Sequence, residues 1–169
     1  MKKKFVLIVV LVFIFLVAGF GLYRTNQANN KNPIYVSVTV LGNAEEHEGT
    51  ARAINSIQLY LDKANVEGGI DGHPLKMLIN VDGGDPSHSP EVALDVVNSP
   101  AIISLGNTYS DAATAAGKIY AENHMPVMTS GATAPDVTID NDWFFRVIND
   151  NIAQGAYIAE YAYVILGSR

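Results

Sequence analysis

The feature that most constrains the fold is a regular alternation of strand-like and helix-like segments from Pro33 to the end of the chain. Short β-branched or apolar runs predict strands, and segments with apolar residues three or four positions apart predict helices. Such an alternation favours a mostly parallel sheet with right-handed crossovers. We therefore predict a three-layer α/β fold with helices on both faces of the sheet. The expected strands are residues 34–40, 75–81, 101–105, 126–129 and 143–147.

Four helices are expected between these strands and after the last one. They are residues 49–64, 111–123, 151–166 and a short helix with Ser89 as its cap and Pro90 as its first residue. The three longer helices each carry one apolar stripe, which predicts the face that packs. These stripes are Ile54, Ile57, Leu61 and Ala64; Ala112, Ala115, Ala116, Ile119 and Tyr120; and Ile152, Ala156, Ala159 and Tyr163.

The amino terminus predicts export. Lys2, Lys3 and Lys4 precede an uncharged run, residues 5–23, that is about long enough to cross a bilayer core. We expect one hydrophobic helix here, so that residues 1–24 are a signal peptide or a transmembrane anchor. The long core and a poor cleavage site favour the anchor, and both readings stay open. The charge distribution puts the rest of the chain outside the cytoplasm, with residues 25–32 as a polar spacer.

Composition excludes several classes of protein. The length of 169 residues allows one domain and a targeting segment. A net charge of −6 offers no basic face for nucleic acid. The chain has no cysteine, which excludes disulfides, thiol catalysis and zinc–cysteine sites. No G-x-G-x-x-G follows the first strand, which disfavours a dinucleotide enzyme. We expect no cofactor, no metal and no nucleic-acid partner.

Two small, hydroxyl-bearing loops each follow a predicted strand. Gly106–Ser110 leaves the strand at 101–105, and Ser130–Thr133 leaves the strand at 126–129. Ligands of open α/β sheets bind outside the carboxyl ends of the strands, so hydroxyls and amides of both loops would face one crevice. This arrangement predicts a site for a small polar molecule. The candidate ligand-binding residues are Thr108, Tyr109, Ser110, Gly131, Ala132 and Thr133.

A carboxylate ligand would suit these loops because it needs several preorganised donors. Ser110 lies where a helix starts, so amides and the helix dipole add to its hydroxyl. Thr133 offers a hydroxyl and an amide, and the Gly131 carbonyl could accept from an ammonium group. The alternatives are that Ser110 is a plain helix cap and Thr133 a turn residue. Tyr109 either flanks the ligand or packs on the sheet edge.

An ordered set of motifs resembles a known family. Asn65–Leu75 is similar to the N-x-x-GGI-x-G-x-x-L segment of the leucine/isoleucine/valine-binding protein family, which comprises two-lobed periplasmic and cell-surface binding proteins of type I. The likeness covers nearly all of residues 34–166. It continues through Asp82–Pro86, Gly106 with Ser110, Ser130–Pro135, Phe145-Arg146, Asp150 and Gln154-Gly155.

The resemblance implies a function and assigns roles. Residues 33–169 would be the first lobe of such a protein, with the second lobe absent. Ser110, Gly131 and Thr133 lie where the family binds the α-carboxylate and α-ammonium groups of an amino acid, often a branched-chain one. The implied role is the extracytoplasmic solute-binding component of an ABC transporter, with a membrane permease as partner. A membrane-anchored ligand sensor and a non-functional fragment are the alternatives, and enzyme activity is not expected.

One loop departs from the family pattern. Leu41–Gly49 carries three glutamates where the family has small and hydroxyl residues. Carboxylates at the mouth of a cleft would disfavour an anionic ligand, but a solvated first helical turn explains them better. Glu46, His47 and Glu48 are consecutive and would point different ways, which argues against a metal site. Asp82 and Asp85 are interpreted as strand-end and turn residues.

Overall fold

The computed structural model describes residues 12–19, 21 and 31–168. Two compact units make up the chain. One contains Gln58–Lys76 and the described residues up to Ile34, and the other contains Tyr35–Ile57 and Met77–Arg169. The second unit holds the candidate site.

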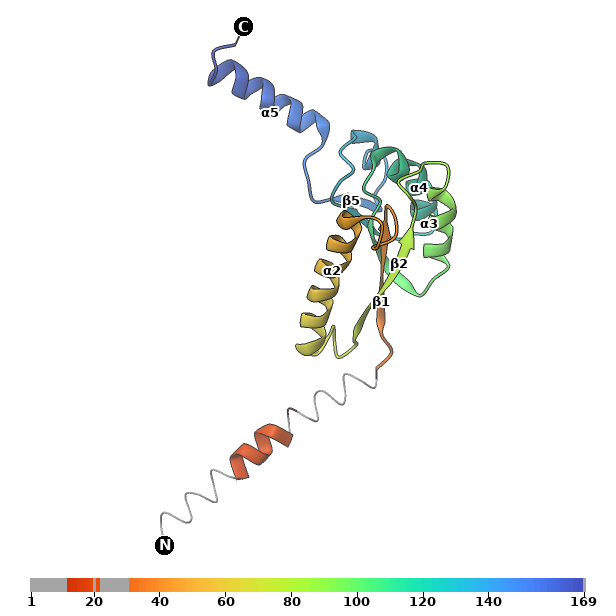
Figure 1. Cartoon of the computed structure of the whole chain (residues 1–169), viewed down its shortest axis with the longest axis vertical. Helices are drawn as coiled ribbons and strands as arrows, with labels where there is room; N and C mark the ends of the chain where they lie inside the picture. Colours follow the sequence, from red (N-terminus) through yellow and green to blue (C-terminus); the bar gives the residue numbers. More distant parts are fainter. Residues whose placement is uncertain (1–11, 20, 22–30, 169) are drawn as a thin grey trace. The chain divides into compact units, whose positions relative to one another are not determined.

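The predicted α/β fold is confirmed (Figure 1). The five strands are β1 (Ile34–Val40), β2 (Leu75–Val81), β3 (Ala101–Gly106), β4 (Val127–Thr129) and β5 (Phe144–Arg146). The helices are α2 (Glu48–Val66), α3 (Ser89–Val97), α4 (Ser110–Glu122), the 3₁₀ turn η1 (Pro135–Val137) and α5 (Asn151–Val164). The sheet order is β2-β1-β3-β4-β5, and β3 pairs in parallel with β1 and β4, as β4 does with β5. The order reverses between β1 and β3, which is the switch point where such sheets bind ligands.

The main core lies where α3 and α4 pack on one face of the sheet. Ala112, Ala116 and Tyr120 of the predicted α4 stripe are fully buried. Small side chains let α4 approach the sheet closely, and Tyr120 fills the remaining space. The core cluster consists of Ala93, Val96, Ala113, Ala116, Tyr120, Met125, Val127, Ala132, Val137 and Phe144.

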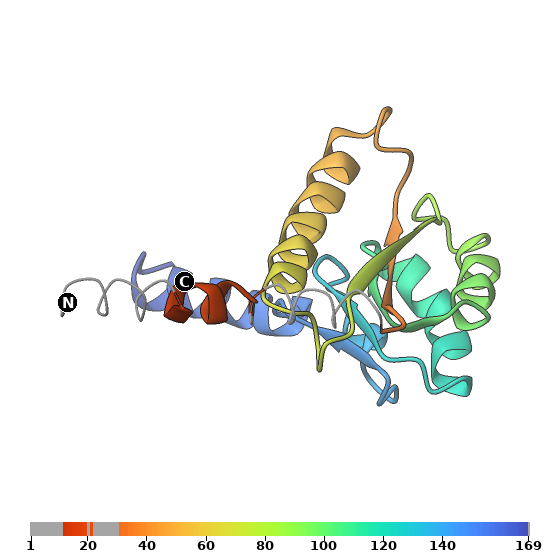
Figure 2. The same cartoon turned by 90° about the horizontal axis from the view of Figure 1, so that it is seen from below.

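The first part of α2, residues 48–57, lies across the sheet from α3 and α4 (Figures 1 and 2). Strand β1 is covered on both faces as a result. Val36 and Val38 are buried on one side of the strand, and Ser37 and Thr39 on the other. The three-layer arrangement expected from the alternation of elements is therefore present.

Backbone conformation explains why the turn between α2 and β2 is rich in glycine. Gly68, Gly69 and Gly72 have φ values of 108°, 70° and 80°, which side-chain-bearing residues rarely adopt. Asn65 closes the turn: its Nδ2 donates to the Leu75 carbonyl at 2.9 Å, and its Oδ1 accepts from the Leu75 amide at 2.6 Å. These contacts account for the Asn and Gly spacing of the motif.

Helix α5 differs from its prediction. It begins where expected, because Asp150 caps it by accepting from the Ala153 amide at 2.8 Å. Its apolar stripe, however, is not packed: no residue of α5 is buried, and Ile152 and Tyr163 are 66% and 71% exposed. Apolar spacing alone does not supply the surface against which a helix packs.

Most of the predicted amino-terminal segment lies outside the described residues, including residues 5–11, 22, 23 and 25–30. Residues 12–19 are helical and exposed. Among the residues that the structure describes, no helix combines the length and the apolar character that crossing a membrane requires.

Candidate functional site

The loops that follow β3 and β4 are in direct contact, as the sequence predicts. A Cβ atom on Gly131 would lie 2.8 Å from the Thr108 carbonyl oxygen. Any side chain at position 131 would therefore collide with the neighbouring loop. Gly106 has a φ of 122° at the end of β3, where a Cβ would meet the Thr39 backbone. Glycine at these positions lets the loops close on each other at the switch point.

Ser110 is not a helix cap, so that interpretation is wrong. Tyr109 occupies the N-cap position in extended backbone, and it makes no side-chain cap hydrogen bond. Ser110 is the first residue of α4, and its Oγ accepts from the Ala134 amide at 3.1 Å. The hydroxyl thereby joins the two loops. Its own proton has no acceptor among the described residues and remains available to a ligand.

Thr133 presents unused donors beside Ser110. It is half-buried, and within the described part of the chain neither its hydroxyl nor its amide forms a hydrogen bond. Its carbonyl accepts from the Asn151 amide at 2.9 Å, which ties the loop to the start of α5. The Thr133 carbonyl is thus held in place, while its hydroxyl and amide are open to a ligand.

Gly131 and Ala132 differ in what they can offer. The Thr129 hydroxyl accepts from both of their amides, each at 3.2 Å. The Gly131 carbonyl has no partner among the described residues. Ala132 is fully buried, and Arg146 binds its carbonyl at 3.4 Å. Of these two candidates, only Gly131 has a backbone group left for a ligand.

Tyr109 lies beside two other loops at the carboxyl ends of the strands. A Cβ on Gly84 would lie 2.9 Å from Cε2 of Tyr109 and from Cδ2 of Leu41. The ring thus packs against the loops that follow β1 and β2. It is nevertheless 55% exposed, so part of it is open to a ligand. Both readings of Tyr109 are compatible with this position.

A chain of buried hydrogen bonds, which the sequence did not reveal, runs beneath the loops. Asp82, 1% exposed at the end of β2, accepts from the Gly84 amide at 2.9 Å and from Asn107 Nδ2 at 3.2 Å. The Asn107 carbonyl accepts from the Thr129 hydroxyl at 3.1 Å. The Asp82–Asn107–Thr129 chain therefore fixes three loops relative to one another. The one local signal was a polar residue at the end of each strand.

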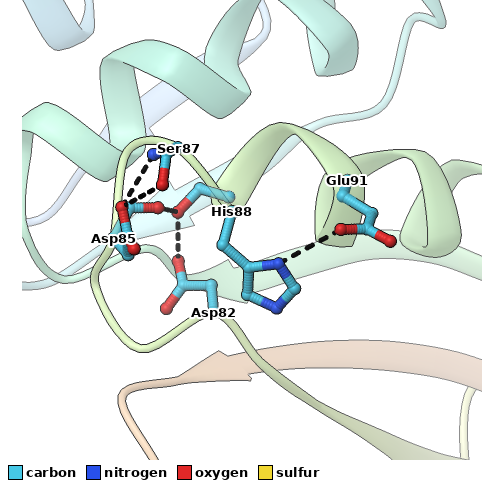
Figure 3. Close-up of polar contacts among 6 residues, drawn as sticks. Asp82, Asp85, Ser87, His88 and Glu91 are labelled. Atoms are coloured by element: carbon cyan, nitrogen blue, oxygen red, sulfur yellow. Dashed lines mark hydrogen bonds and ion pairs between the residues drawn. The ribbon is translucent and has the colours of Figure 1, made fainter.

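The turn after β2 is held by its own side chains (Figure 3). The Asp85 carboxylate accepts from the Ser87 hydroxyl at 2.7 Å and the Ser87 amide at 2.8 Å. These bonds hold the pKa of Asp85 below its usual value. His88 Nδ1 lies 3.3 Å from the Glu91 carboxylate on the exposed surface. The prediction that Asp85 is a turn residue is confirmed.

Helix α3 begins one residue earlier than its predicted cap implies. His88 is the N-cap residue and makes no side-chain cap bond, so the assignment of Ser89 as cap is wrong. The Ser89 hydroxyl donates instead toward the Asp85 carbonyl at 2.8 Å and toward Asp82 Oδ2 at 3.1 Å. The Ser89 hydroxyl thus binds the preceding turn, whereas the Ser110 hydroxyl binds a loop 24 residues away in sequence.

Arg146 of β5 binds the loop after β4. Its Nη1 donates to the carbonyls of Ala132 at 3.4 Å and Ala134 at 2.9 Å. Its Nη2 donates to the Pro135 carbonyl at 3.2 Å and to the Thr138 hydroxyl. The guanidinium thus makes all of its contacts with one loop. The sequence motif contained Arg146, but assigned it no role.

The acidic loop after β1 is exposed. Glu45, Glu46 and Glu48 all face solvent, and Glu48 pairs with Arg52 at 2.6 Å along α2. This arrangement supports the reading of a solvated first turn. Within the described residues, no group of three or more His, Cys, Asp or Glu side chains is placed to hold a metal ion.

Comparisons with known proteins point in one direction. The family model described as periplasmic binding protein matches residues 42–167. A leucine-, isoleucine-, valine-, threonine- and alanine-binding protein of Pseudomonas aeruginosa is 30% identical over 149 residues, which cover 85% of this chain and 39% of that protein. The chain thus spans well under half the length of this relative.

Solved structures share the fold. The branched-chain amino acid transporter substrate-binding protein LivJ of Streptococcus pneumoniae, in complex with isoleucine, matches with a TM-score of 0.68 and 23% identity, over 81% of this chain and 39% of that one. A putative branched-chain amino acid ABC transporter protein of Rhodospirillum rubrum matches with a TM-score of 0.65 and 26% identity, over 78% and 38%.

Proposed function

We infer that this chain, which belongs to the periplasmic binding protein family, is a lobe that binds the carboxylate and ammonium groups of an amino acid outside the cytoplasm. One observation carries the proposal. The Ser110 hydroxyl proton and the hydroxyl and amide of Thr133 lie on adjoining loops at the carboxyl ends of β3 and β4, without acceptors or partners among the described residues. Preorganised donors of this kind suit a carboxylate.

A branched-chain amino acid is the ligand that we propose. The Pseudomonas relative is named for five amino acids, of which three are branched-chain, and the Streptococcus structure contains isoleucine. The partly exposed ring of Tyr109 supplies apolar surface next to the two hydroxyl loops, which an aliphatic side chain can cover. The exposed glutamates of the loop after β1 lie in solvent, where salt and water weaken their repulsion of an anion.

Delivery of the ligand to a membrane permease of an ABC transporter is the proposed role. A membrane-anchored sensor is the second candidate, because the long apolar run at residues 5–23 lacks a good cleavage site. Mass spectrometry of the amino terminus after expression in a bacterial host separates the two: a retained segment favours the sensor and a cleaved one favours transport. An alkaline phosphatase fusion at Arg169 should be active, and an inactive but stable fusion would contradict an extracytoplasmic location.

A ligand panel tests the chemistry. In ligand-observed NMR with the full chain, leucine, isoleucine and valine should bind saturably. Leucinamide lacks the carboxylate charge and 4-methylpentanoate lacks the ammonium group, so each should bind more weakly than leucine. Putrescine, a dication, serves as the control for the acidic loop. If putrescine binds more tightly than leucine, the glutamates rather than the hydroxyl loops hold the ligand, and the proposal fails.

A further inference from the structure

Arg146 has an unusual set of partners for a half-buried cation. All four groups that its guanidinium binds are uncharged: three carbonyl oxygens and the Thr138 hydroxyl. Across the described residues, no aspartate or glutamate forms an ion pair with it. The positive charge is therefore stabilised by the dipoles of these four groups but is not neutralised by an acidic side chain. It lies in hydrogen-bond contact with the loop after β4.

The contact between Arg146 and the Ala132 carbonyl determines the direction of the Thr133 amide. The carbonyl of Ala132 and the amide of Thr133 belong to one trans peptide, in which C=O and N–H point in opposite directions. Arg146 binds that carbonyl at 3.4 Å. The Thr133 N–H is consequently directed away from the guanidinium, and it has no partner among the described residues. Arg146 Nη1 also donates to the Ala134 carbonyl at 2.9 Å, so the residues before and after Thr133 are both held.

We propose that Arg146 is a positioning residue for ligand recognition: its guanidinium binds the backbone carbonyls of the loop after β4 and so presents the Thr133 amide to an anionic ligand group. Its unneutralised charge also raises the electrostatic potential at that amide, which favours a carboxylate over a neutral carboxamide. The inference rests on the proposed function, because it requires that the loops after β3 and β4 bind a carboxylate.

Variants of the full chain test the role. Arg146→Gln removes the charge and most of the donors, whereas Arg146→Lys keeps the charge without the planar fork. Lys118→Gln is the matched charge control, since this lysine is 80% exposed on α4. The readout is the ratio of leucine to leucinamide affinity, measured by NMR titration. Arg146→Gln should lower this ratio by about fivefold or more, Arg146→Lys should fall between it and the wild type, and Lys118→Gln should leave it unchanged.

A purely structural role for Arg146 would weaken both ligands equally, so an unchanged ratio in Arg146→Gln overturns the inference. A second measurement needs no variant. In the wild-type protein, leucine should shift the Thr133 amide resonance more than leucinamide does. A silent Thr133 amide, while Ser110 and Gly131 respond to leucine, overturns this inference, and the proposed function would then rest on the Ser110 and Thr133 hydroxyls. If no residue responds to leucine, the proposed function fails together with it.

Discussion

Ser110 shows how one hydroxyl can serve the fold and a ligand together. One lone pair accepts from the Ala134 amide at 3.1 Å, while the proton has no acceptor among the described residues. The contact fixes the distance between the loops after β3 and β4, and it orients the hydroxyl. Thr133 lies on the facing loop with its hydroxyl and amide unused. Two donors from two loops can thus converge on one carboxylate.

Ser110→Ala and Thr133→Ala should each weaken leucine binding by about 1 kcal/mol. This is less than the value of about 1.5–3 kcal/mol for buried hydrogen bonds to charged groups, because a ligand bound to these loops stays partly in water. The two losses should not add, since both donors address one carboxylate. NMR titration measures both effects. Glu46→Gln, in the exposed loop, is the control and should have little effect. Loss of binding in Glu46→Gln with none in Ser110→Ala would refute the amino-acid assignment.

The two variants should differ in stability. Ser110→Ala leaves the Ala134 amide without its acceptor, which costs about 1 kcal/mol of unfolding free energy, whereas Thr133→Ala removes no hydrogen bond within the described residues. Urea unfolding followed by the fluorescence of Trp143, the single tryptophan of the chain, measures this difference. Equal losses for both variants would mean that the contact between Ser110 and Ala134 is not formed in solution.

Tyr120 should lose its proton at a higher pH in the folded chain than in the unfolded chain. Burial raises the pKa of its hydroxyl above the ordinary value of 10.0, and the charge of Asp82 adds to this rise. Nearby hydroxyls of Ser104 and Thr39 oppose it, although the Tyr120 hydroxyl makes no well-aligned hydrogen bond within the described residues. Since the phenol loses its proton more easily in the unfolded chain, its stabilising contribution is complete below about pH 10 and is lost as pH rises further.

Ultraviolet absorbance of the phenolate in the folded chain should therefore include a step above about pH 10 that Tyr120→Phe removes. If Tyr120→Phe leaves the titration above about pH 10 unchanged, Tyr120 is not buried as described.

At the scale of elements, the Asp82–Asn107–Thr129 chain links loops that lie 25 and 22 residues apart in sequence. Such partners cannot be identified from local patterns, because each residue alone resembles an ordinary strand end or turn. Strands and helices were predictable because their periodicity is local, and β1 and β2 match their expected ranges. The cap at Ser89 was misassigned because its hydroxyl binds the preceding turn, and the cap alternative for Ser110 fails because its hydroxyl binds a loop 24 residues away.

Thr129→Val should test the Asp82–Asn107–Thr129 hydrogen-bond chain, because the side chain changes little in volume. It leaves the Gly131 and Ala132 amides without their shared acceptor, and buried unsatisfied amides cost about 1–3 kcal/mol. The exposed Thr114→Val on α4 is the matched control and should stay within about 0.5 kcal/mol of the wild type. Chemical denaturation provides both values. A Thr129→Val protein as stable as the control would show that these amides find other partners.

Helix α5 should contribute little to the stability of the sheet. Ile158 is 65% exposed, whereas Phe144 in β5 is 3% exposed. Ile158→Ala should therefore change the unfolding free energy by less than about 0.5 kcal/mol, and Phe144→Ala should cost about 3–5 kcal/mol. Thermal unfolding of the two variants side by side makes the comparison. A large loss for Ile158→Ala would mean that α5 packs against a surface in solution.

At the scale of the molecule, the resemblance seen in the sequence is confirmed, and so is the lobe fold, but this chain spans 39% of the Pseudomonas relative. Under the proposed function, the described residues provide one set of ligand contacts at the carboxyl ends of the strands. Water therefore competes for the other side of any bound amino acid, and each hydrogen bond exchanges for one to solvent. We expect dissociation constants in the millimolar range for the chain alone. Micromolar binding by the monomer would contradict this expectation of a solvent-open site.

The most direct measurement is a residue-resolved NMR titration of the full chain with leucine. The account predicts that amide resonances of Ser110, Gly131 and Thr133 shift together along one saturable curve, while those of residues 43–48 in the acidic loop stay in place. Shifts confined to the acidic loop would contradict the account, as would an absence of any response at millimolar leucine, because in either case the two hydroxyl loops would not be the ligand site.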